Sequence, residues 1–355
     1  MFKKSKDPSR VLNLVQAVRQ PNSLGGVSEE FDSYNAKISS YLSSSLAPST
    51  SESYFLSFNR FSKFCVENNV PVLPTNVEVF MTFLIKISEE AGSAAPAKLM
   101  RSAVRHFNIL NNPSQPSPTD REDISLLIRS FDRKFAKPVR KSDPTTIVIV
   151  RKLIDSLLNG DQLRFFNFQK SVEDWQLVAK TVVKFYCFAR FEEVLDLKLS
   201  NFDFQPSGHL VVTFFKSKNN QFHDARKCTI APAENALYCP VNILKKYVAV
   251  MNFPKDSSVY FLPRFVQGTP NFLLKTNYAY CVSRFKAGLL KIGVNPEKFG
   301  EHSDRIGGLS AAANAGCSIS ELQTHGRWKS DYAPKLYHKK SLFQREKVSN
   351  VLNDL

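Results

Sequence analysis

The sequence lacks any run of apolar residues long enough to cross a membrane, which takes about 20 residues as a helix. The N-terminal stretch MFKKSKDPSRVLNLVQAVRQ also lacks the apolar segment of a secretory signal peptide. No internal repeat and no low-complexity block is present. The first two absences predict an intracellular protein without a membrane partner.

Metal-binding and disulfide patterns are missing as well. The six cysteines contain no CxxC pair, and they are Cys65, Cys187, Cys228, Cys239, Cys281 and Cys317. Several lie in apolar runs, which favours reduced thiols in a core over disulfides or a zinc site. No closely spaced set of carboxylates of the kind used by two-metal nucleases is found. We therefore expect neither a metal nor a cofactor.

Acidic residues are few relative to basic ones. The chain has 32 Asp and Glu against 48 Lys and Arg, a formal net charge of +16, and the basic residues recur along its length. This balance favours a polyanionic partner, nucleic acid first and an acidic membrane surface second. Charge alone does not separate these partners from a basic protein that binds neither.

The apolar content is sufficient for well-packed cores. Of 355 residues, 43% are hydrophobic and 12% aromatic, and this length favours two domains over one. We divide the chain into a mobile basic tail (1–30), a helical domain (31–136), a linker rich in proline and charge (137–146), a mixed domain (147–346) and a C-terminal tail (347–355).

Helix-start signals recur in the first domain. Three capping boxes each precede a helical apolar pattern, and they pair Ser49 with Glu52, Thr75 with Glu78, and Thr119 with Glu122. Two further helices are expected across 98–110 and 124–135. The region 31–136 is therefore predicted to be all-helical.

The second domain shows both periodicities. Two β-like stretches, 210–215 and 227–232, flank a polar turn and predict a hairpin. Helices are predicted at 147–158, 172–189, 240–251, 277–292, 303–315, 318–325 and 330–346. The pattern favours a mainly helical domain with a small antiparallel sheet.

Residues 301–340 concentrate polar and aromatic side chains. In HSDRIGG, His302 and Arg305 are three apart, so on a helix they share a face, and Gly307 with Gly308 permits close approach of a neighbour. Two such donors suit an anion, although a solvated helix face has the same pattern. Further along, GRWKSDYAPKLYHKK places Trp328 nine residues before Tyr337.

Two other candidates lie upstream. Arg190 follows a strongly apolar helix, and its guanidinium needs a polar partner there because an unpaired buried charge is costly. A structural salt bridge to Glu192 or Glu193 would satisfy it. Lys216 and Lys218 lie in the hairpin turn, where lysines are commonly only solubilising.

These elements occur in the order Arg, hairpin Lys, His-x-x-Arg, Trp, Tyr, and in that order the chain resembles the tyrosine recombinases, or phage-type integrases. HSDRIGG followed by GRWKSD is most similar to the eukaryotic transposon-borne Crypton, Ngaro and DIRS branch. The resemblance spans both halves of the chain. It implies a helical, SAM-like core-binding domain and a mixed α+β catalytic domain of the DNA breaking-rejoining type.

The resemblance also implies the roles of individual residues. The site residues that it implies are Arg190 and Arg305 as catalytic arginines, Lys218 as the hairpin lysine, His302, Trp328 in a place that is often His, Tyr337 as nucleophile, and Glu193 in support. Lys216 is the alternative hairpin lysine. Trp328 departs from the commonest pattern because an indole donates a hydrogen bond but exchanges no proton.

The implied reaction cleaves and rejoins double-stranded DNA through a 3′-phosphotyrosyl linkage, without metal or ATP, for integration or excision of a mobile element in the nucleus. The implied assembly is a homo-oligomer, a tetramer in the synaptic complex, formed by exchange of C-terminal helices. Apolar residues in the tail SLFQREKVSNVLNDL favour this exchange, and packing of the tail on its own domain is the alternative. Two alternatives stay open, a non-enzymatic DNA-binding descendant and a monomeric type IB topoisomerase.

Tyr332 is a second candidate nucleophile, four residues after Trp328. The segment SDYAP favours a turn or the start of a helix, since Pro334 is tolerated only in a first turn, whereas Tyr337 falls one turn inside the helix. This position and the resemblance favour Tyr337. His325 and His338 match no position of the family and are expected at the surface or in supporting roles.

Overall fold

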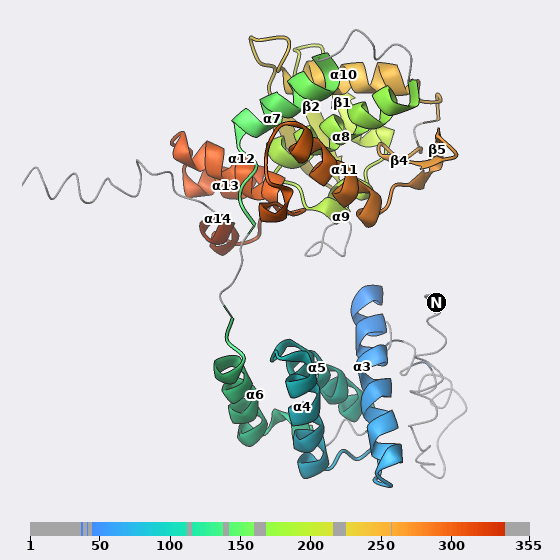
Figure 1. Cartoon of the computed structure of the whole chain (residues 1–355), viewed down its shortest axis with the longest axis vertical. Helices are drawn as coiled ribbons and strands as arrows, with labels where there is room; N and C mark the ends of the chain where they lie inside the picture. Colours follow the sequence, from blue (N-terminus) through green and yellow to red (C-terminus); the bar gives the residue numbers. More distant parts are fainter. Residues whose placement is uncertain are drawn as a thin grey trace, which may run out of the picture. The chain divides into compact units, whose positions relative to one another are not determined.

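The computed structural model describes residues 45–111, 116–137, 142–159, 168–215, 225–256 and 258–337, together with Lys37 and Tyr41. The chain forms two compact units, Met1–Val139 and Arg140–Leu355, here called unit 1 and unit 2 (Figure 1). No helix in these ranges has the length and apolarity needed to cross a membrane.

The described part of unit 1 is helical, as predicted. Its elements are α3 (Pro48–Glu67), α4 (Val77–Ala91), α5 (Ala95–Asn111), a 3₁₀ turn (Pro118–Asp120) and α6 (Glu122–Lys134). Aromatic side chains fill its core: Phe58 stacks on Phe107 with ring centroids 4.1 Å apart. The apolar three- and four-residue spacing of α3 and α4 therefore faces this core.

The predicted capping boxes of α3 and α4 are wrong, although the helices lie where expected. Pro48 occupies the first helical position of α3, so Ser49 lies inside the first turn and not at its cap. In α4 the cap is Asn76, whose side chain accepts from the Val79 N–H, while the Thr75 hydroxyl donates to a loop carbonyl. An Asn side chain next to the helix reaches the free N–H groups better than a hydroxyl one residue earlier.

The third predicted capping box, Thr119 with Glu122, is also wrong. Thr119 belongs to the 3₁₀ turn and is fully buried, with its hydroxyl hydrogen-bonded to Ser117. Arg121 takes the N-cap position of α6 without a side-chain cap. The short turn before the helix consumes the hydroxyl that the sequence pattern assigned to the cap.

Unit 2 combines helices with two small antiparallel sheets. Its main helices are α7 (Ile147–Ile154), α8 (Phe168–Tyr186), α9 (Phe191–Leu195), α10 (Pro240–Met251), α11 (Tyr278–Lys291), α12 (Ser303–Asn314), α13 (Ile319–His325) and α14 (Tyr332–Tyr337). A π turn follows α7 at Asp155–Asn159, and 3₁₀ turns lie at Leu199–Asn201 and Pro296–Lys298. The predicted helices are present, and the part of 330–346 beyond Tyr337 lies outside the described residues.

The predicted hairpin is part of a three-stranded sheet. Strands β1 (Phe202–Phe204), β2 (Leu210–Phe214) and β3 (Arg226–Ile230) pair in that order, and Phe214 lies opposite Arg226 at the open end of β2 and β3. A second hairpin, β4 (Pro263–Val266) with β5 (Thr269–Lys275), was not predicted. Its turn residues Gln267 and Gly268 have φ of 48° and 82°, and Gln is an unusual residue for that conformation.

Helix α8 lies at the centre of unit 2 and packs against α7, α10 and α12 (Figure 1). Its apolar residues Val178, Val182 and Val183 are at most 1% exposed. The two glycines after Arg305 let α12 approach closely: a Cβ on Gly307 would lie 1.8 Å from the Thr145 carbonyl oxygen, and one on Gly308 would lie 1.9 Å from that of Phe185. The predicted close approach at this glycine pair is confirmed.

Residues 142–146, in the second half of the predicted linker, lie against the start of α12. The Thr145 N–H donates to the Ser303 carbonyl at 3.0 Å, and the Thr145 hydroxyl donates to the Asp304 carboxylate at 2.8 Å. Thr145 is fully buried. This segment therefore helps to hold the helix that carries Arg305.

Candidate active site

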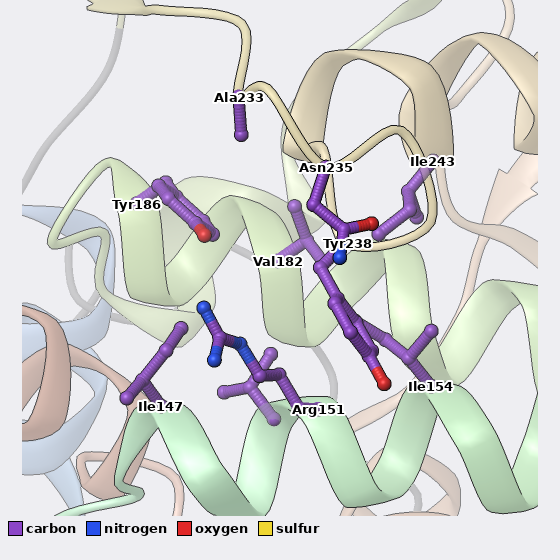
Figure 2. A pocket seen from close by; sticks show the side chains of 10 residues that line it. Ile147, Arg151, Ile154, Val182, Tyr186, Ala233, Asn235, Tyr238 and Ile243 are labelled. Atoms are coloured by element: carbon purple, nitrogen blue, oxygen red, sulfur yellow. The ribbon is translucent and has the colours of Figure 1, made fainter.

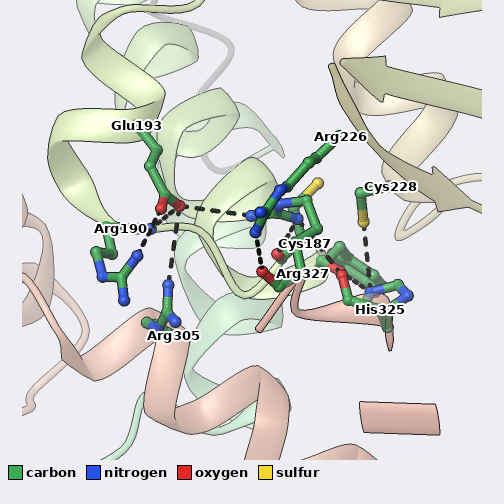
Figure 3. Close-up of polar contacts among 9 residues, drawn as sticks. Cys187, Arg190, Glu193, Arg226, Cys228, Arg305, His325 and Arg327 are labelled. Carbon is green, nitrogen blue, oxygen red and sulfur yellow. Dashed lines mark hydrogen bonds and ion pairs between the residues drawn. The ribbon is translucent and has the colours of Figure 1, made fainter. Parts of the chain in front are cut away.

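One buried carboxylate gathers three arginines (Figure 3). Glu193 accepts hydrogen bonds from the backbone N–H of Arg190 at 2.8 Å and from its Nη1 at 2.9 Å. Nη2 of Arg327 lies 3.4 Å from Glu193 Oε2, and Nη1 of Arg305 lies 3.8 Å from the same oxygen. The structure thus brings together the predicted Arg190, Glu193 and Arg305, and adds Arg327.

The break after α8 places Arg190 and Glu193. Phe188 has a φ of 47°, a left-handed conformation that ends the helix, and Arg190 then becomes the N-cap residue of α9. Glu193 is the third residue of that short helix, so its carboxylate reaches back to the Arg190 N–H. The salt bridge considered from the sequence therefore exists, and it is made by Glu193 and not by the exposed Glu192.

Helix α12 supplies Arg305 and His302. Arg305 is 1% exposed, and its guanidinium lies 4.7 Å from the ring centroid of Trp328. His302 precedes the first residue of α12 and is exposed to solvent. Partial desolvation and the charges of Lys184, Arg305 and Arg190 lower the pKa of His302 from its usual 6.5. His302 is therefore neutral at pH 7 and can accept a proton.

Trp328 closes the site next to Arg305. Its ring packs in a small apolar cluster with Phe188, Leu309, Ala313 and Leu322. The indole N–H is buried and has no hydrogen-bond acceptor among the described residues. Gly326 makes room for the ring, because a Cβ there would lie 2.0 Å from it. A buried donor on a ring that lies against the Arg305 guanidinium can bind an anion.

A second buried charge cluster lies under the start of α12. Lys184 Nζ is 2.6 Å from Glu301 Oε2 and 3.3 Å from Asp304 Oδ2, and Lys180 Nζ is 3.4 Å from Glu301 Oε1. Burial disfavours the charge of Lys180, but the carboxylates outweigh it and raise the pKa of Lys180. Because Glu301 and Asp304 flank His302, this cluster fixes the segment that presents His302 and Arg305.

His325 and the thiols lie next to the arginine cluster. His325 Nε2 is 2.7 Å from the Tyr186 carbonyl oxygen and 3.5 Å from Cys228 Sγ, so this half-buried side chain has a supporting role and connects the end of α13 with the end of α8 and with β3. All six cysteines are free thiols, as predicted. Five are buried, and Cys317, after the end of α12, is exposed.

The two candidate tyrosines lie on α14. Tyr332 is its first residue and is 68% exposed, and Tyr337 is the last residue that is described. Pro334 is in the first turn of the helix, where proline is tolerated. The predicted hairpin lysines, Lys216 and Lys218, and His338 lie outside the described residues.

A small pocket elsewhere on unit 2 has a mostly apolar lining (Figure 2). It lies between α7, α8 and the start of α10. Its polar groups pair with each other: the Arg151 guanidinium lies 5.2 Å from the Tyr238 ring centroid, and the Tyr238 hydroxyl donates to Asp155. We assign no chemistry to this pocket. In the described ranges, no group of three or more His, Cys, Asp or Glu is arranged to hold a metal ion.

Arg327 and Lys184 are the residues of this region that were missed from the sequence. Arg327 lies within the GRW motif that was noted for Trp328 alone. Lys180 and Lys184 are four apart on a strongly apolar helix, a pattern that calls for buried carboxylate partners. Both signals were present, but their partners lie more than a hundred positions away.

No family model and no curated protein sequence matches this chain. Solved structures do match its fold. One is XerH site-specific recombinase bound to a palindromic difH substrate, with 13% identity and a TM-score of 0.59 over 99% of this chain and 98% of that one. Another is a lambda integrase dimer bound to a COC′ core site, with 15% identity and a TM-score of 0.52 over 87% and 94%.

A third match is the Tn1549 transposon integrase in complex with transposon right end DNA, with 13% identity and a TM-score of 0.50 over 97% of this chain and 99% of that one. These neighbours are recombinases or integrases in complex with DNA, and each match includes both units of the chain. The helical architecture, the small antiparallel sheets and these matches agree with the resemblance of the motifs. The chain has the fold of the tyrosine recombinases.

Proposed function

We propose that the chain is a site-specific DNA recombinase or integrase that cleaves and rejoins DNA through a 3′-phosphotyrosyl intermediate. The observation that carries the proposal is the arrangement around Glu193: Arg190 and Arg305 contact the same carboxylate, and the unpaired indole N–H of Trp328 lies beside Arg305. A site with this excess of donors is suited to a phosphodiester.

The arginines have a direct chemical role in this proposal. Attack on a DNA phosphate gives a pentavalent transition state with more negative charge on its non-bridging oxygens than the ground state. Planar guanidinium groups bind two oxygens at once and stabilise that charge differentially. Glu193 holds Arg190 in place, and its negative charge offsets the repulsion among the guanidinium groups. Trp328 contributes one further donor, but no proton.

Proton transfer falls to other residues. The Tyr337 oxygen forms a bond to phosphorus while the bond from phosphorus to the 5′-oxygen breaks. Neutral His302 accepts the tyrosine proton or contacts the phosphate, and Lys218 supplies a proton to the leaving 5′-oxygen.

The phosphotyrosyl linkage keeps the energy of the broken bond, so a 5′-hydroxyl of another strand can reverse the step without ATP. Strand exchange then needs several copies on one DNA complex, and we propose a tetramer held together by C-terminal helices. We also propose that the protein acts in the nucleus on the ends of a mobile element. The basic surface would supply affinity for double-stranded DNA that weakens as salt rises.

A nicked suicide duplex carrying the terminal sequence of the encoding element tests the proposal. We expect a covalent protein–DNA adduct that resists denaturant and is absent from Tyr337→Phe. Tyr332→Phe is the matched control, since this tyrosine lies on the same helix, and it should retain the adduct.

Other outcomes identify the alternatives. No adduct with any duplex, combined with salt-dependent binding, would show a DNA-binding protein without catalysis. Relaxation of a supercoiled plasmid by a strictly monomeric protein would instead show a topoisomerase. An adduct lost in Tyr332→Phe and retained in Tyr337→Phe would reassign the nucleophile.

A further inference from the structure

Arg327 makes three kinds of contact with its side chain. Nη1 donates to the Cys187 carbonyl oxygen at 2.8 Å, Nη2 lies 3.4 Å from Glu193 Oε2, and the guanidinium carbon lies 3.9 Å from the centroid of the Phe214 ring. The side chain is only 7% exposed. These contacts use the donors, the charge and the flat face of a guanidinium together, a combination that lysine cannot supply.

The partners of Arg327 belong to different parts of the candidate site. Cys187 lies in the turn that leads to Arg190, and Glu193 is the carboxylate shared by the arginines. Phe214 is the last residue of β2 and lies opposite Arg226 of β3, and Arg226 Nη1 in turn donates to the Arg327 carbonyl at 2.9 Å. Arg327 therefore connects the end of α8, the start of α9 and the base of the β2–β3 hairpin.

The backbone of Arg327 sets the position of Trp328. Its φ is 58°, a left-handed conformation that is uncommon for a residue other than glycine and is held by the surrounding contacts. The turn lets the backbone N–H of Trp328 donate to the Gln323 carbonyl at 3.0 Å. It also directs the indole over Gly326 towards Arg305. The orientation of the indole therefore depends on the anchors of the preceding residue.

The contacts of Arg327 favour a supporting role and not contact with substrate. Both Nη atoms of Arg327 already contact protein acceptors, the Cys187 carbonyl and Glu193, and the Phe214 ring lies against its guanidinium. Three guanidinium groups around one carboxylate leave a formal charge of +2. Because all three contact Glu193, each arginine limits how the others can move. Loss of Arg327 would let Glu193 shift towards the remaining two.

We propose that Arg327 is a positioning residue: it holds Glu193, the base of the hairpin and Trp328 in one fixed arrangement, so that the arginines and the indole N–H meet the same phosphate group. This inference rests on the proposed function for its catalytic consequence, but its structural part can be measured without DNA. A displacement of about 1 Å in such a site lowers rate by up to about a hundredfold.

The structural part is tested by fluorescence. The chain has two tryptophans, so Trp175→Phe leaves Trp328 as the single emitter. In this background we expect Arg327→Lys to shift the emission of Trp328 to longer wavelength and to raise its quenching by acrylamide severalfold, because the indole loses its fixed, buried position. Lys329→Gln, at the exposed next residue, is the matched control and should leave both unchanged.

The catalytic part is tested with the suicide duplex. We expect Arg327→Lys to form the covalent adduct about a hundred times more slowly at saturating DNA, with the DNA concentration for half-maximal binding within about twofold of that of the wild type. Arg327→Met, which keeps length but not charge, should be at least as slow. If Arg327→Lys prevents folding, Phe214→Leu takes away the ring against Arg327 while keeping an apolar side chain in the core, and it should give a smaller change in the same direction.

The outcomes separate the two proposals. Wild-type emission, quenching and adduct rate in a folded Arg327→Lys would overturn the positioning role. A changed emission together with an unchanged adduct rate would also overturn it, because the site would then tolerate the displacement. If the wild type itself forms no adduct, the proposed function fails, and the fluorescence of Arg327→Lys still decides whether Arg327 fixes Trp328.

Discussion

The two units use charge in opposite ways. In the described part of unit 1, every ion pair lies at the surface, with side chains between 38% and 79% exposed, as in Lys98 with Asp132 and Arg105 with Asp120. Unit 2 also has exposed pairs, but Lys180, Lys184 and Glu301 lie inside it, each at most 5% exposed. Among the residues that the structure describes, buried charges therefore occur only in the unit that contains the candidate site.

The difference between exposed and buried ion pairs indicates that the buried charges are present for function and not for stability. Exposed pairs contribute little to the free energy of folding because solvent screens them and ordering the side chains costs entropy. Buried charges lose their hydration, and a well-packed apolar core would stabilise at least as well. The ions inside unit 2 therefore indicate a requirement for position, since they hold the helix that presents His302 and Arg305.

The largest expected effect comes from Lys184, which contacts both Glu301 and Asp304. Lys184→Met should lower the free energy of unfolding of unit 2 by about 3–5 kcal/mol, because two buried carboxylates lose a shared cation. Urea denaturation followed by tryptophan emission measures this, since Trp175 and Trp328 both belong to unit 2. A change below about 1 kcal/mol would remove the distinction between the units.

Substitution of Arg305 should have the opposite pattern to that of Lys184, with a loss of activity and no loss of stability. Arg305→Gln should slow adduct formation by about a hundred- to a thousandfold, equivalent to about 3–4 kcal/mol, since one donor to the transition state is lost. Its melting temperature should stay equal to that of the wild type or rise, because Glu193 keeps Arg190 and Arg327 and one buried cation is removed. Equal losses of activity and stability would contradict a functional reason for this charge.

The pH dependence of His302 gives a smaller effect. Because its pKa is lowered from 6.5, the imidazole is less than half protonated in the folded protein at a pH where that of the unfolded chain is half protonated. The adduct rate should therefore still exceed half of its plateau at pH 6.5, and it should pass through half of the plateau at a lower pH. In His302→Gln this acidic decline should disappear along with most of the rate. A midpoint above 6.5 would be incompatible with a desolvated histidine among cations.

The smallest effect is expected in unit 1. Lys98→Gln removes the pair with Asp132, in which both side chains are about half exposed. We expect the free energy of unfolding to fall by less than about 1 kcal/mol, and 0.5 M NaCl should reduce even that difference. A loss comparable to that of Lys184→Met, measured by the same denaturation followed by circular dichroism, would show that unit 1 depends on its surface charges.

Local patterns predicted much of this arrangement. The glycine pair after Arg305, the hairpin of β2 and β3 and the pairing of Arg190 with Glu193 all depend on residues close in sequence. The capping boxes failed because a neighbouring proline, asparagine or 3₁₀ turn took over the helix start. Local spacing does not decide between such competitors, which differ by only about 1 kcal/mol.

Arg327 could not be assigned from spacing because its contacts are remote. Glu193 and Cys187 lie 134 and 140 positions earlier in the chain. An arginine between a glycine and a tryptophan has many possible partners, and only the folded chain selects the Cys187 carbonyl and the Phe214 ring. The same holds for Lys184 and Glu301, 117 positions apart.

The burial of five of the six thiols has a practical consequence. Under native conditions a maleimide dye should attach to the natural chain at Cys317 alone, without removal of the other cysteines. This residue follows α12, the helix that begins beside His302 and Arg305. The unaltered protein thus offers a single reporter position just beyond the helix whose first turn carries Arg305, and phosphate binding in the site could be followed there in real time.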